Sequence, residues 1–282
     1  MSKNLQLEDS IPVSQLLKEL GFISSLQMKQ VISLLSNSSQ FRHVDFQIDF
    51  FGIKIEGHTS NLIDRHLYFL GSYELSILQE IQKILSSKKD TIFIDVGSNI
   101  GLHSCFASRF AGHVYSFEPY HLVRERSLEI IKKNNISNIT IFPYGLGKFD
   151  ELLSFVNPPQ SNSGLGTFLN NPQSENALQV KNGDSFLKEK SINNVDLIKI
   201  DTEGFETFVL EGLWQTIDRC RPSLIVEYSE KTHQYLAKNE KLMDFIKKNY
   251  HTFIFPYPNS PDSPQLPWNY DFFGNILFKP KV

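Results

Sequence analysis

The chain of 282 residues has few cysteines, no long apolar run and no cluster of positive charge. Its two cysteines, Cys105 and Cys220, form no C-x-x-C or Cys/His pattern, which argues against a disulfide framework and against a zinc site. No uninterrupted apolar stretch approaches the ~20 residues of a membrane span, and no apolar signal-peptide core follows the first charges. These absences predict a cytoplasmic protein without a transmembrane segment.

The charge balance argues against nucleic acid as a partner. The formal net charge is −3, and the lysine pairs at 88–89, 132–133 and 247–248 are isolated from one another. Proteins that bind DNA or RNA normally carry a basic excess. An apolar content of 40% and 23 phenylalanines are ample for a packed core. We therefore expect a globular protein that does not bind nucleic acid.

Short apolar segments alternate with helical patterns from residue 92 onward. We expect strands at 92–96, 114–118, 139–143, 195–201 and 223–228, and helices at 101–110, 121–134, 184–190 and 203–213. This alternation is typical of a parallel sheet covered by helices on both faces. Two further strands, within YHTFIFPY and DFFGNILF, could pair antiparallel across a proline-rich connection. The predicted fold class is therefore α/β and Rossmann-like, with a mostly parallel seven-stranded sheet and a C-terminal antiparallel pair.

The segment before residue 92 differs from this pattern. It predicts helices near 13–20 and 26–35, a hairpin that turns at Phe51-Gly52, and an amphipathic helix at about 73–86. We expect residues 1–72 to form an N-terminal α/β extension or cap and residues 73–282 to form the main domain. A polar insertion at about 157–172 should be a loop or a small hairpin.

The stretch TIFIDVGSNIGLHS places two glycines, Gly97 and Gly101, directly after the first strand of this pattern. Ligands in such sheets bind at the carboxyl ends of the strands. The spacing differs from the G-x-G-x-x-G fingerprint of dinucleotide sites. Asp95 would also repel a pyrophosphate, by about 4 kcal/mol at ~4 Å and an effective dielectric near 20. The glycine spacing together with Asp95 favours the cationic cofactor S-adenosylmethionine. Glu118, which ends the second strand and could accept both ribose hydroxyls, is a feature that NAD sites share.

At these residues the sequence resembles the FkbM family of S-adenosylmethionine-dependent methyltransferases. The resemblance rests on FIDVGSNIGLHS, YSFEPY and VDLIKIDTEGFETFVLEG, with NGD before Phe186 and the closing FFGNILF. It spans about residues 73–278, and its narrowest signal is K-I-D-x-E-G-x-E after a strand. The resemblance implies a class I methyltransferase fold and methylation of a hydroxyl group on a sugar, as a sugar nucleotide, glycan, glycolipid or glycosylated natural product.

The resemblance also implies a cofactor site, residue by residue. Asp95, Gly97, Asn99 and Gly101 would line the methionine part, and Glu118 would hold the ribose. Tyr144 would lie near the adenine. Ser98, which stands where alanine is commoner in the family, and Pro119 complete the predicted set.

Position after the strands suggests the catalytic groups. Asp201 and Glu203 follow the fourth strand, and His103 lies two residues after Gly101; each could act as the general base that an alcohol acceptor needs. Helix-start acids also stabilise the helix dipole, and this structural role is the alternative for Glu203 and for Glu206. Asp201, Glu203 and Glu227 could instead converge on Mg²⁺ or Ca²⁺. We predict no metal but keep that alternative.

The acceptor is the least specified ligand. Glu227 and the aromatic residues Tyr257 and Trp268 of the proline-rich connection are predicted to contact it, since aromatic faces suit stacking on a sugar ring. The alternatives are a methyltransferase that acts on a non-sugar small molecule and a non-catalytic cofactor-binding protein of the same fold. A homodimer is one option for the assembly.

Overall fold

The computed structural model describes residues 42–159, 161–163, 166–169, 176–236, 239–255, 266–267 and 274–281. The helices expected near 13–20 and 26–35 lie outside these residues. Within them, no helix combines the length and apolar character needed to cross a bilayer.

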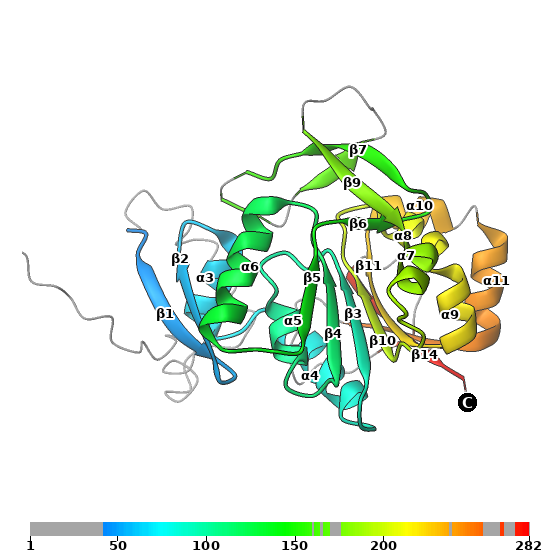
Figure 1. The fold of residues 1–282 in the computed structure, drawn as a ribbon, viewed down its shortest axis with the longest axis horizontal. Coiled ribbons are helices and arrows are strands. Elements are labelled where there is room, and N and C mark those ends of the chain that lie inside the picture. The colour runs from blue at the N-terminus through cyan, green and yellow to red at the C-terminus, as the bar shows by residue number, and fades with distance from the viewer. Residues whose placement is uncertain are drawn as a thin grey trace, which may run out of the picture.

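The core of the molecule is an eight-stranded sheet (Figure 1). Its strand order is β13-β12-β14-β11-β10-β3-β4-β5. The strands are β3 (Ile92–Val96), β4 (His113–Phe117), β5 (Ile139–Phe142), β10 (Leu197–Ile200), β11 (Ser223–Tyr228), β12 (Tyr250–Ile254), β13 (Leu266–Pro267) and β14 (Gly274–Pro280). β3 pairs in parallel with β4 and β10, whereas β14 runs antiparallel to both β11 and β12. The predicted seven-stranded sheet is confirmed, and the two-residue β13 extends its edge.

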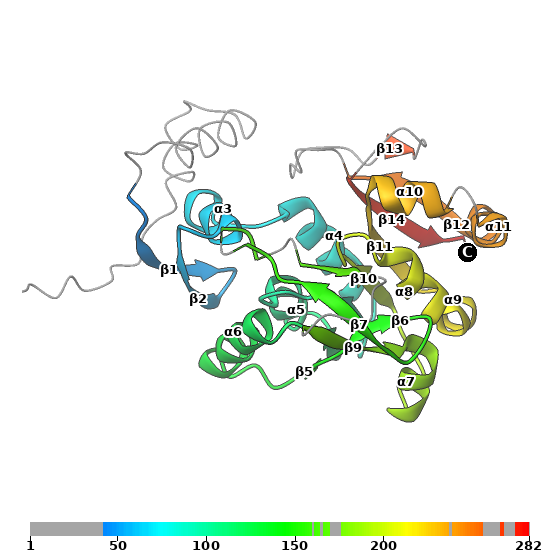
Figure 2. The same ribbon diagram turned by 90° about the horizontal axis from the view of Figure 1, so that it is seen from above.

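Helices cover both faces of this sheet, as predicted (Figure 2). One face carries α4 (Leu75–Leu85), α5 (Leu102–Ala107) and α6 (His121–Lys133). The other carries α7 (Gly183–Glu189), α8 (Glu206–Gly212), α9 (Trp214–Cys220), α10 (Glu230–Leu236) and α11 (Glu240–Asn249). Successive strand residues point to opposite faces, so Phe93 packs in the first apolar cluster while Ile94 and Val96 pack in the second.

The N-terminal segment adds a hairpin and a helix to the first face. β1 (Asp45–Phe50) and β2 (Ile53–His58) pair through the predicted turn, where Phe51 and Gly52 both have positive φ, 53° and 83°. α3 (Leu62–Leu70) follows. Apolar side chains of these elements belong to the same buried cluster as α5 and α6. Both terminal nitrogens of Arg126 on α6, Nη1 and Nη2, donate to the Asp64 carboxylate, at 3.0 and 2.6 Å. The domain boundary at residue 72 stays a prediction.

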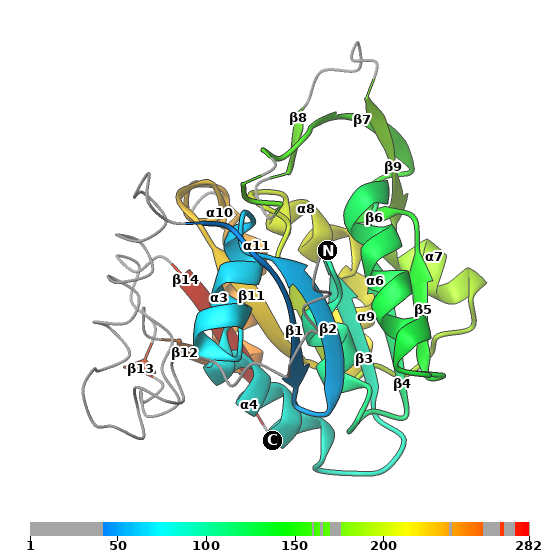
Figure 3. The same cartoon turned by 90° about the vertical axis from the view of Figure 1, so that its left-hand side faces the viewer.

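A second, four-stranded sheet rises over the carboxyl ends of the main strands (Figures 1 and 3). It consists of β6 (Gly145–Gly147), β7 (Glu151–Val156), β8 (Thr167–Leu169) and β9 (Ala177–Asn182) in the order β6-β9-β7-β8. β7 and β8 form the small hairpin foreseen as one option at 157–172. The sheet around it was not predicted, because strands of three to six residues give too short a pattern. We call these four strands the cap.

Candidate functional site

A pocket opens where the chain changes direction across the main sheet. From β3 the chain continues to β4 and β5 on one side, and later returns to β10 and β11 on the other. The turns after β3 and β10 therefore diverge and leave a space at the carboxyl ends of the strands. The turns after β3, β4 and β10 line this space together with the cap.

Two glycines shape the turn after β3. Gly97 has a φ of 79°, and a Cβ at this position would lie 1.8 Å from the carbonyl oxygen of Asp201. Gly101 has a φ of 78°, and its Cβ would lie 2.2 Å from Ser127 Oγ. Both positions thus require glycine on steric grounds. Gly97 lines the pocket with Ser98 and Asn99, whereas Gly101 packs against α6 behind it.

Glu118 stands at one end of the pocket, directly after β4. Its carboxylate accepts hydrogen bonds from the backbone N–H of Asn99 at 2.8 Å and of Tyr120 at 2.9 Å. The side chain is 7% exposed. Burial raises the pKa of Glu118 to about 7, and the two backbone hydrogen bonds and the Arg124 charge oppose that rise only in part. Pro119 lines the pocket beside it.

Besides Gly101, two predicted cofactor residues do not line the pocket. Asp95 lies inside β3 and shares its face with Phe93, so its fully buried carboxylate meets α5, where Ser104 Oγ donates a hydrogen bond of 2.6 Å. Tyr144 packs against Phe186, with ring centroids 5.8 Å apart. Their predicted contacts with the cofactor stay predictions.

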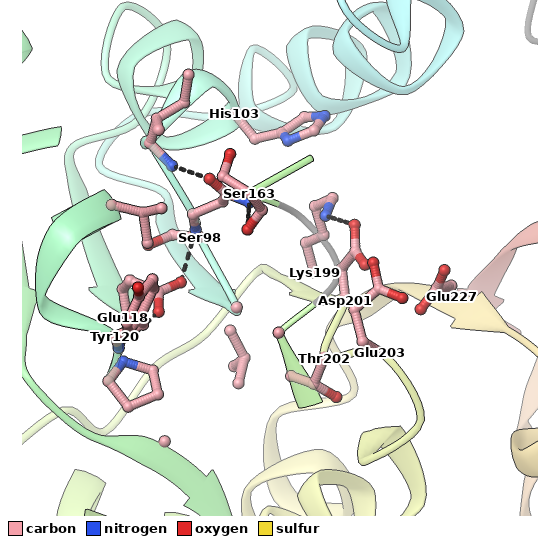
Figure 4. Close-up of a pocket in the computed structure, with 18 of the residues that line it drawn as sticks. Ser98, His103, Glu118, Tyr120, Ser163, Lys199, Asp201, Thr202, Glu203 and Glu227 are labelled. Atoms are coloured by element: carbon pink, nitrogen blue, oxygen red, sulfur yellow. Dashed lines mark hydrogen bonds and ion pairs between the residues drawn. The ribbon is translucent and has the colours of Figure 1, made fainter. Parts of the chain in front are cut away.

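Three carboxylates gather at the other end of the pocket, opposite Glu118 (Figure 4). Asp201, Glu203 and Glu227 each bring one oxygen within 4.8 Å of the others, so they converge as the metal alternative requires. However, Lys199 Nζ already donates to Asp201 Oδ2 at 2.7 Å, from a side chain that is 2% exposed. We call Asp201, Glu203 and Glu227 the acid cluster.

Repulsion between the carboxylates of the acid cluster makes it costly for all of them to be ionised at once. Two like charges 4.8 Å apart repel by about 3 kcal/mol at an effective dielectric near 20. Burial, followed by the charges of Asp201, Glu206 and Glu203, raises the pKa of Glu227 well above its usual range. Burial alone would lower the pKa of Lys199, but the charges of Asp201, Asp95 and Glu74 outweigh it and keep the pKa raised. Lys199 is therefore a charged ammonium, and Glu227 binds its proton more tightly than an ordinary glutamate does.

A second pair of ionisable residues, Glu74 and His103, also lines the pocket and was not foreseen as a unit. His103 Nε2 lies 3.3 Å from Glu74 Oε2, and Asn275 donates to Glu74 Oε1 at 3.1 Å. Burial raises the pKa of Glu74, but the hydrogen bond and charge of His103, with Lys199 and Asn275, outweigh burial and lower it. Glu74 has a φ of 51°, a conformation that is costly for a non-glycine residue and concentrates at functional sites.

Glu206 holds the turn after β10 in place. Its Oε1 accepts hydrogen bonds from the backbone N–H of Thr202 and of Gly204, both at 2.9 Å, and its Oε2 accepts one from Thr232 at 2.8 Å. The side chain is fully buried. This arrangement favours the structural role for Glu206.

The cap supplies lining residues that the sequence gave no reason to choose. Phe155 and Phe168 border the pocket from above, with ring centroids 5.6 Å apart. Ser163 accepts a hydrogen bond at its carbonyl from Asn99 Nδ2 at 3.3 Å, and Thr167 Oγ1 donates to the carbonyl of Glu203 at 2.9 Å. The cap and its β7–β8 connection are thus hydrogen-bonded to the turn after β3 and to the turn after β10. Tyr257 and Trp268 lie outside the described residues.

Comparison with known proteins agrees with this geometry. The sequence profile described as "Methyltransferase FkbM domain" matches residues 95–254. That range contains the glycine turn, Glu118 and the acid cluster.

Two curated relatives and one solved structure are similar to the chain. A hexuronic acid methyltransferase, AglP, of Haloferax volcanii is 29% identical over 139 residues, 48% of this chain and 56% of that protein. A protein named methyltransferase 1 from Beauveria bassiana is 27% identical over 155 residues, 46% of this chain and 62% of that protein. The chain thus spans little more than half the length of the curated relatives it matches. The crystal structure of methyltransferase FkbM from Methylobacillus flagellatus KT is 14% identical with a TM-score of 0.46, and the match covers 95% of this chain and 66% of that one.

Proposed function

The chain belongs to the FkbM methyltransferase family, and on that premise we propose that it transfers a methyl group from S-adenosylmethionine to a sugar hydroxyl. One observation carries the proposal. A single pocket at the switch point of the sheet joins the glycine turn and Glu118 at one end to the acid cluster at the other. The first end suits the donor, and the second suits an acceptor that must lose a proton.

The residues of the first end fit the cofactor. Gly97 leaves a space that a Cβ would fill, and Ser98, which is 5% exposed, has an Oγ without a hydrogen-bond partner among the described residues. Gly97, Ser98 and Asn99 would hold the methionine part. Glu118 would accept hydrogen bonds from the ribose hydroxyls, with Pro119 beside it. When bound, the cofactor supplies a methyl group activated by a sulfonium charge.

The second end supplies proton acceptors and hydrogen-bond acceptors. Asp201, Glu203 and His103 all line the pocket and stay the predicted catalytic candidates. Lys199 fixes the orientation of the Asp201 carboxylate, which makes Asp201 suited to orienting an acceptor hydroxyl. An ionised carboxylate accepts hydrogen bonds and donates none, so ionised carboxylates of the cluster complement the donor hydroxyls of a sugar.

The name of the Haloferax volcanii relative supports a sugar acceptor. The acceptor in this proposal is a sugar nucleotide, glycan, glycolipid or glycosylated natural product. A non-sugar acceptor and a non-catalytic role are the competing outcomes. A homodimer, a cytoplasmic location and the contacts of Tyr257 and Trp268 with the acceptor also stay predictions.

Calorimetry followed by methyl-transfer assays tests the proposal. We expect S-adenosylhomocysteine to bind with a micromolar Kd and NAD⁺ not to bind. Transfer of labelled methyl from S-adenosylmethionine should then appear with sugar hydroxyl acceptors and be absent with their O-methylated counterparts. Binding without transfer to any acceptor would favour the non-catalytic alternative, and transfer only to non-sugar alcohols would replace the sugar.

The pH dependence of cofactor binding tests the role of Glu118. An ionised carboxylate can accept from both ribose hydroxyls, and the pKa of Glu118 is raised to about 7. We therefore expect the affinity for S-adenosylhomocysteine, measured by calorimetry, to increase as the pH rises through about 7. Glu118→Gln should bind more weakly and lose this dependence. An equal pH dependence in wild type and Glu118→Gln would contradict the assignment.

A further inference from the structure

We propose that Glu227 is the general base that takes the proton of the acceptor hydroxyl. The inference rests on the proposed methyl transfer and chooses among the acidic residues of the pocket. Glu227, predicted from sequence to contact the substrate, then has a catalytic role, and Asp201 orients the acceptor.

Position favours Glu227 over its two neighbours. It lies within β11, next to the last residue that pairs with β10, and its own register partner is Asn275 on β14. Glu203 lies instead on the turn after β10, with a φ of 53°. Side chains on paired strands are positioned more rigidly than side chains on turns. Proton transfer requires such fixed geometry, since the base must reach the acceptor within hydrogen-bond distance.

Hydrogen bonding also separates the candidates. Lys199 Nζ donates a hydrogen bond to Asp201 Oδ2 at 2.7 Å, so that carboxylate oxygen already has a partner. Glu227 Oε2 is buried and has no hydrogen-bond partner in the part of the chain that the structure describes. Glu227 lines the pocket (Figure 4). A buried carboxylate oxygen without a partner is costly unless a ligand donates to it, and an acceptor hydroxyl would be that donor.

The surroundings of Glu227 strengthen it as a base. The ionisable groups that act on it come from four segments of the chain, namely Lys199 on β10, Asp201 and Glu203 on the following turn, Glu206 on α8, and Tyr73 before α4. Burial and the three acids disfavour its negative charge, and only Lys199 favours it. An ionised Glu227 is thus a strong proton acceptor, which matches the high pKa of an alcohol.

The proposed step balances in atoms and charge. The acceptor oxygen forms a bond to the methyl carbon as the bond from that carbon to sulfur breaks, and the electron pair of the broken bond stays on sulfur. The hydroxyl proton passes to the Glu227 carboxylate. The sulfonium charge and the Glu227 carboxylate charge disappear together, so the net charge of the reacting groups is unchanged.

Glu227→Gln tests the step with Glu203→Gln as its matched control. Both changes are isosteric and remove one acid of the cluster. We expect Glu227→Gln to lower kcat by about 10²- to 10⁴-fold, with acceptor KM and the Kd of S-adenosylhomocysteine nearly unchanged. Glu203→Gln should lower kcat far less. Equal kcat losses in the two variants, or full activity in Glu227→Gln, would overturn the proposal.

The pH profile distinguishes a base from a structural carboxylate. In the wild type, kcat should rise with pH on the alkaline side, because the pKa of Glu227 is raised. Asp201→Asn should move this rise to lower pH, since it removes the acid that raises that pKa most. The rise should be absent in Glu227→Gln. Loss of wild-type activity in EDTA, restored by Mg²⁺, would assign the cluster to a metal and overturn the proposal.

A spectroscopic test does not depend on the acceptor. Difference infrared spectra of the S-adenosylhomocysteine complex, recorded as the pH is raised, should show a carboxyl group that converts to carboxylate at alkaline pH, above the pH of about 7 at which Glu118 ionises. This signal should vanish in Glu227→Gln and persist in Glu203→Gln. If the infrared signal persisted in Glu227→Gln, the assignment to Glu227 would be overturned, whether or not methyl transfer had been found. If the signal behaved as expected but no acceptor were methylated, the proposed function would be the part that fails.

Discussion

Gly97→Ala is expected to lower the affinity for S-adenosylhomocysteine by about 100-fold or more, which is about 2.7 kcal/mol. The new Cβ would lie 1.8 Å from the Asp201 carbonyl oxygen, so the turn after β3 and the turn after β10 must separate. Both turns line the pocket. The φ of 79° adds a backbone cost of about 1 to 2 kcal/mol for any residue with a Cβ. Calorimetry measures the affinity, and circular dichroism checks that the variant is folded.

Gly52→Ala is the matched control for this substitution. Gly52 has nearly the same backbone conformation, with a φ of 83°, but its Cβ would meet only the flexible end of Arg109, at 3.4 Å. It lies in the turn of the β1–β2 hairpin, and it does not line the pocket. This variant should lose a little stability and bind the cofactor as the wild type does. Equal affinities of Gly97→Ala and Gly52→Ala would show that contact between the two turns does not matter for binding.

Lys199→Met is expected to lower the free energy of unfolding by about 3 to 5 kcal/mol at neutral pH. The ammonium is 2% exposed and bonded to Asp201 at 2.7 Å, and the charges of Asp201, Asp95 and Glu74 all act on it. Its removal leaves buried carboxylates without a compensating charge. Urea denaturation measures the loss. The double variant with Asp201→Asn should recover part of it, because one of those carboxylates is then neutral.

The pH dependence of this loss has a definite sign. Without Lys199, the negative charge of its neighbours has no compensating ammonium in the folded state, so the variant should lose stability as the pH rises and these carboxylates ionise. The difference from the wild type should therefore be larger at neutral pH. Lys88→Met breaks an ion pair with Asp196 from a side chain that is 64% exposed, and it should cost no more than about 1 kcal/mol. Similar losses in the two lysine variants would contradict the account of Lys199.

The sheet could be predicted from sequence because its signal is local. Strands β3, β4 and β10 are each a short apolar run followed by a helical pattern, and a strand-to-helix turn with glycines indicates where a ligand binds. The direction of the Asp95 side chain was harder to foresee. The strand expected at 92–96 is β3, and strand alternation turns Asp95 toward α5.

The polar network of the pocket could not be predicted, because its members come from distant segments. Glu74 and Asn275 are 201 residues apart and meet only because α4 packs over the face of the sheet that contains β14. Lys199 lies in the K-I-D-x-E-G-x-E motif, but nothing in the sequence distinguishes it from an ordinary strand residue. Its role becomes visible only in the structure, where Asp95 is its register partner on β3 and Asp201 accepts its hydrogen bond. Short strands concealed the cap, and with it Phe155 and Phe168.

Glu74 and Asn275 also bear on how acceptor preference diverges within this family. The stretch matched by the family profile, residues 95–254, includes Gly97, Glu118 and the acid cluster but ends short of both residues. Glu74, which contacts His103 and whose charge interacts with Lys199, and its partner Asn275 therefore both lie in the segments that flank the matched stretch. Substitutions in those flanks can alter the acceptor end of the pocket while the donor end stays as it is. Under the proposed function, substitutions at Glu74 or Asn275 would therefore be a route to a changed acceptor that leaves the cofactor residues of the matched stretch intact.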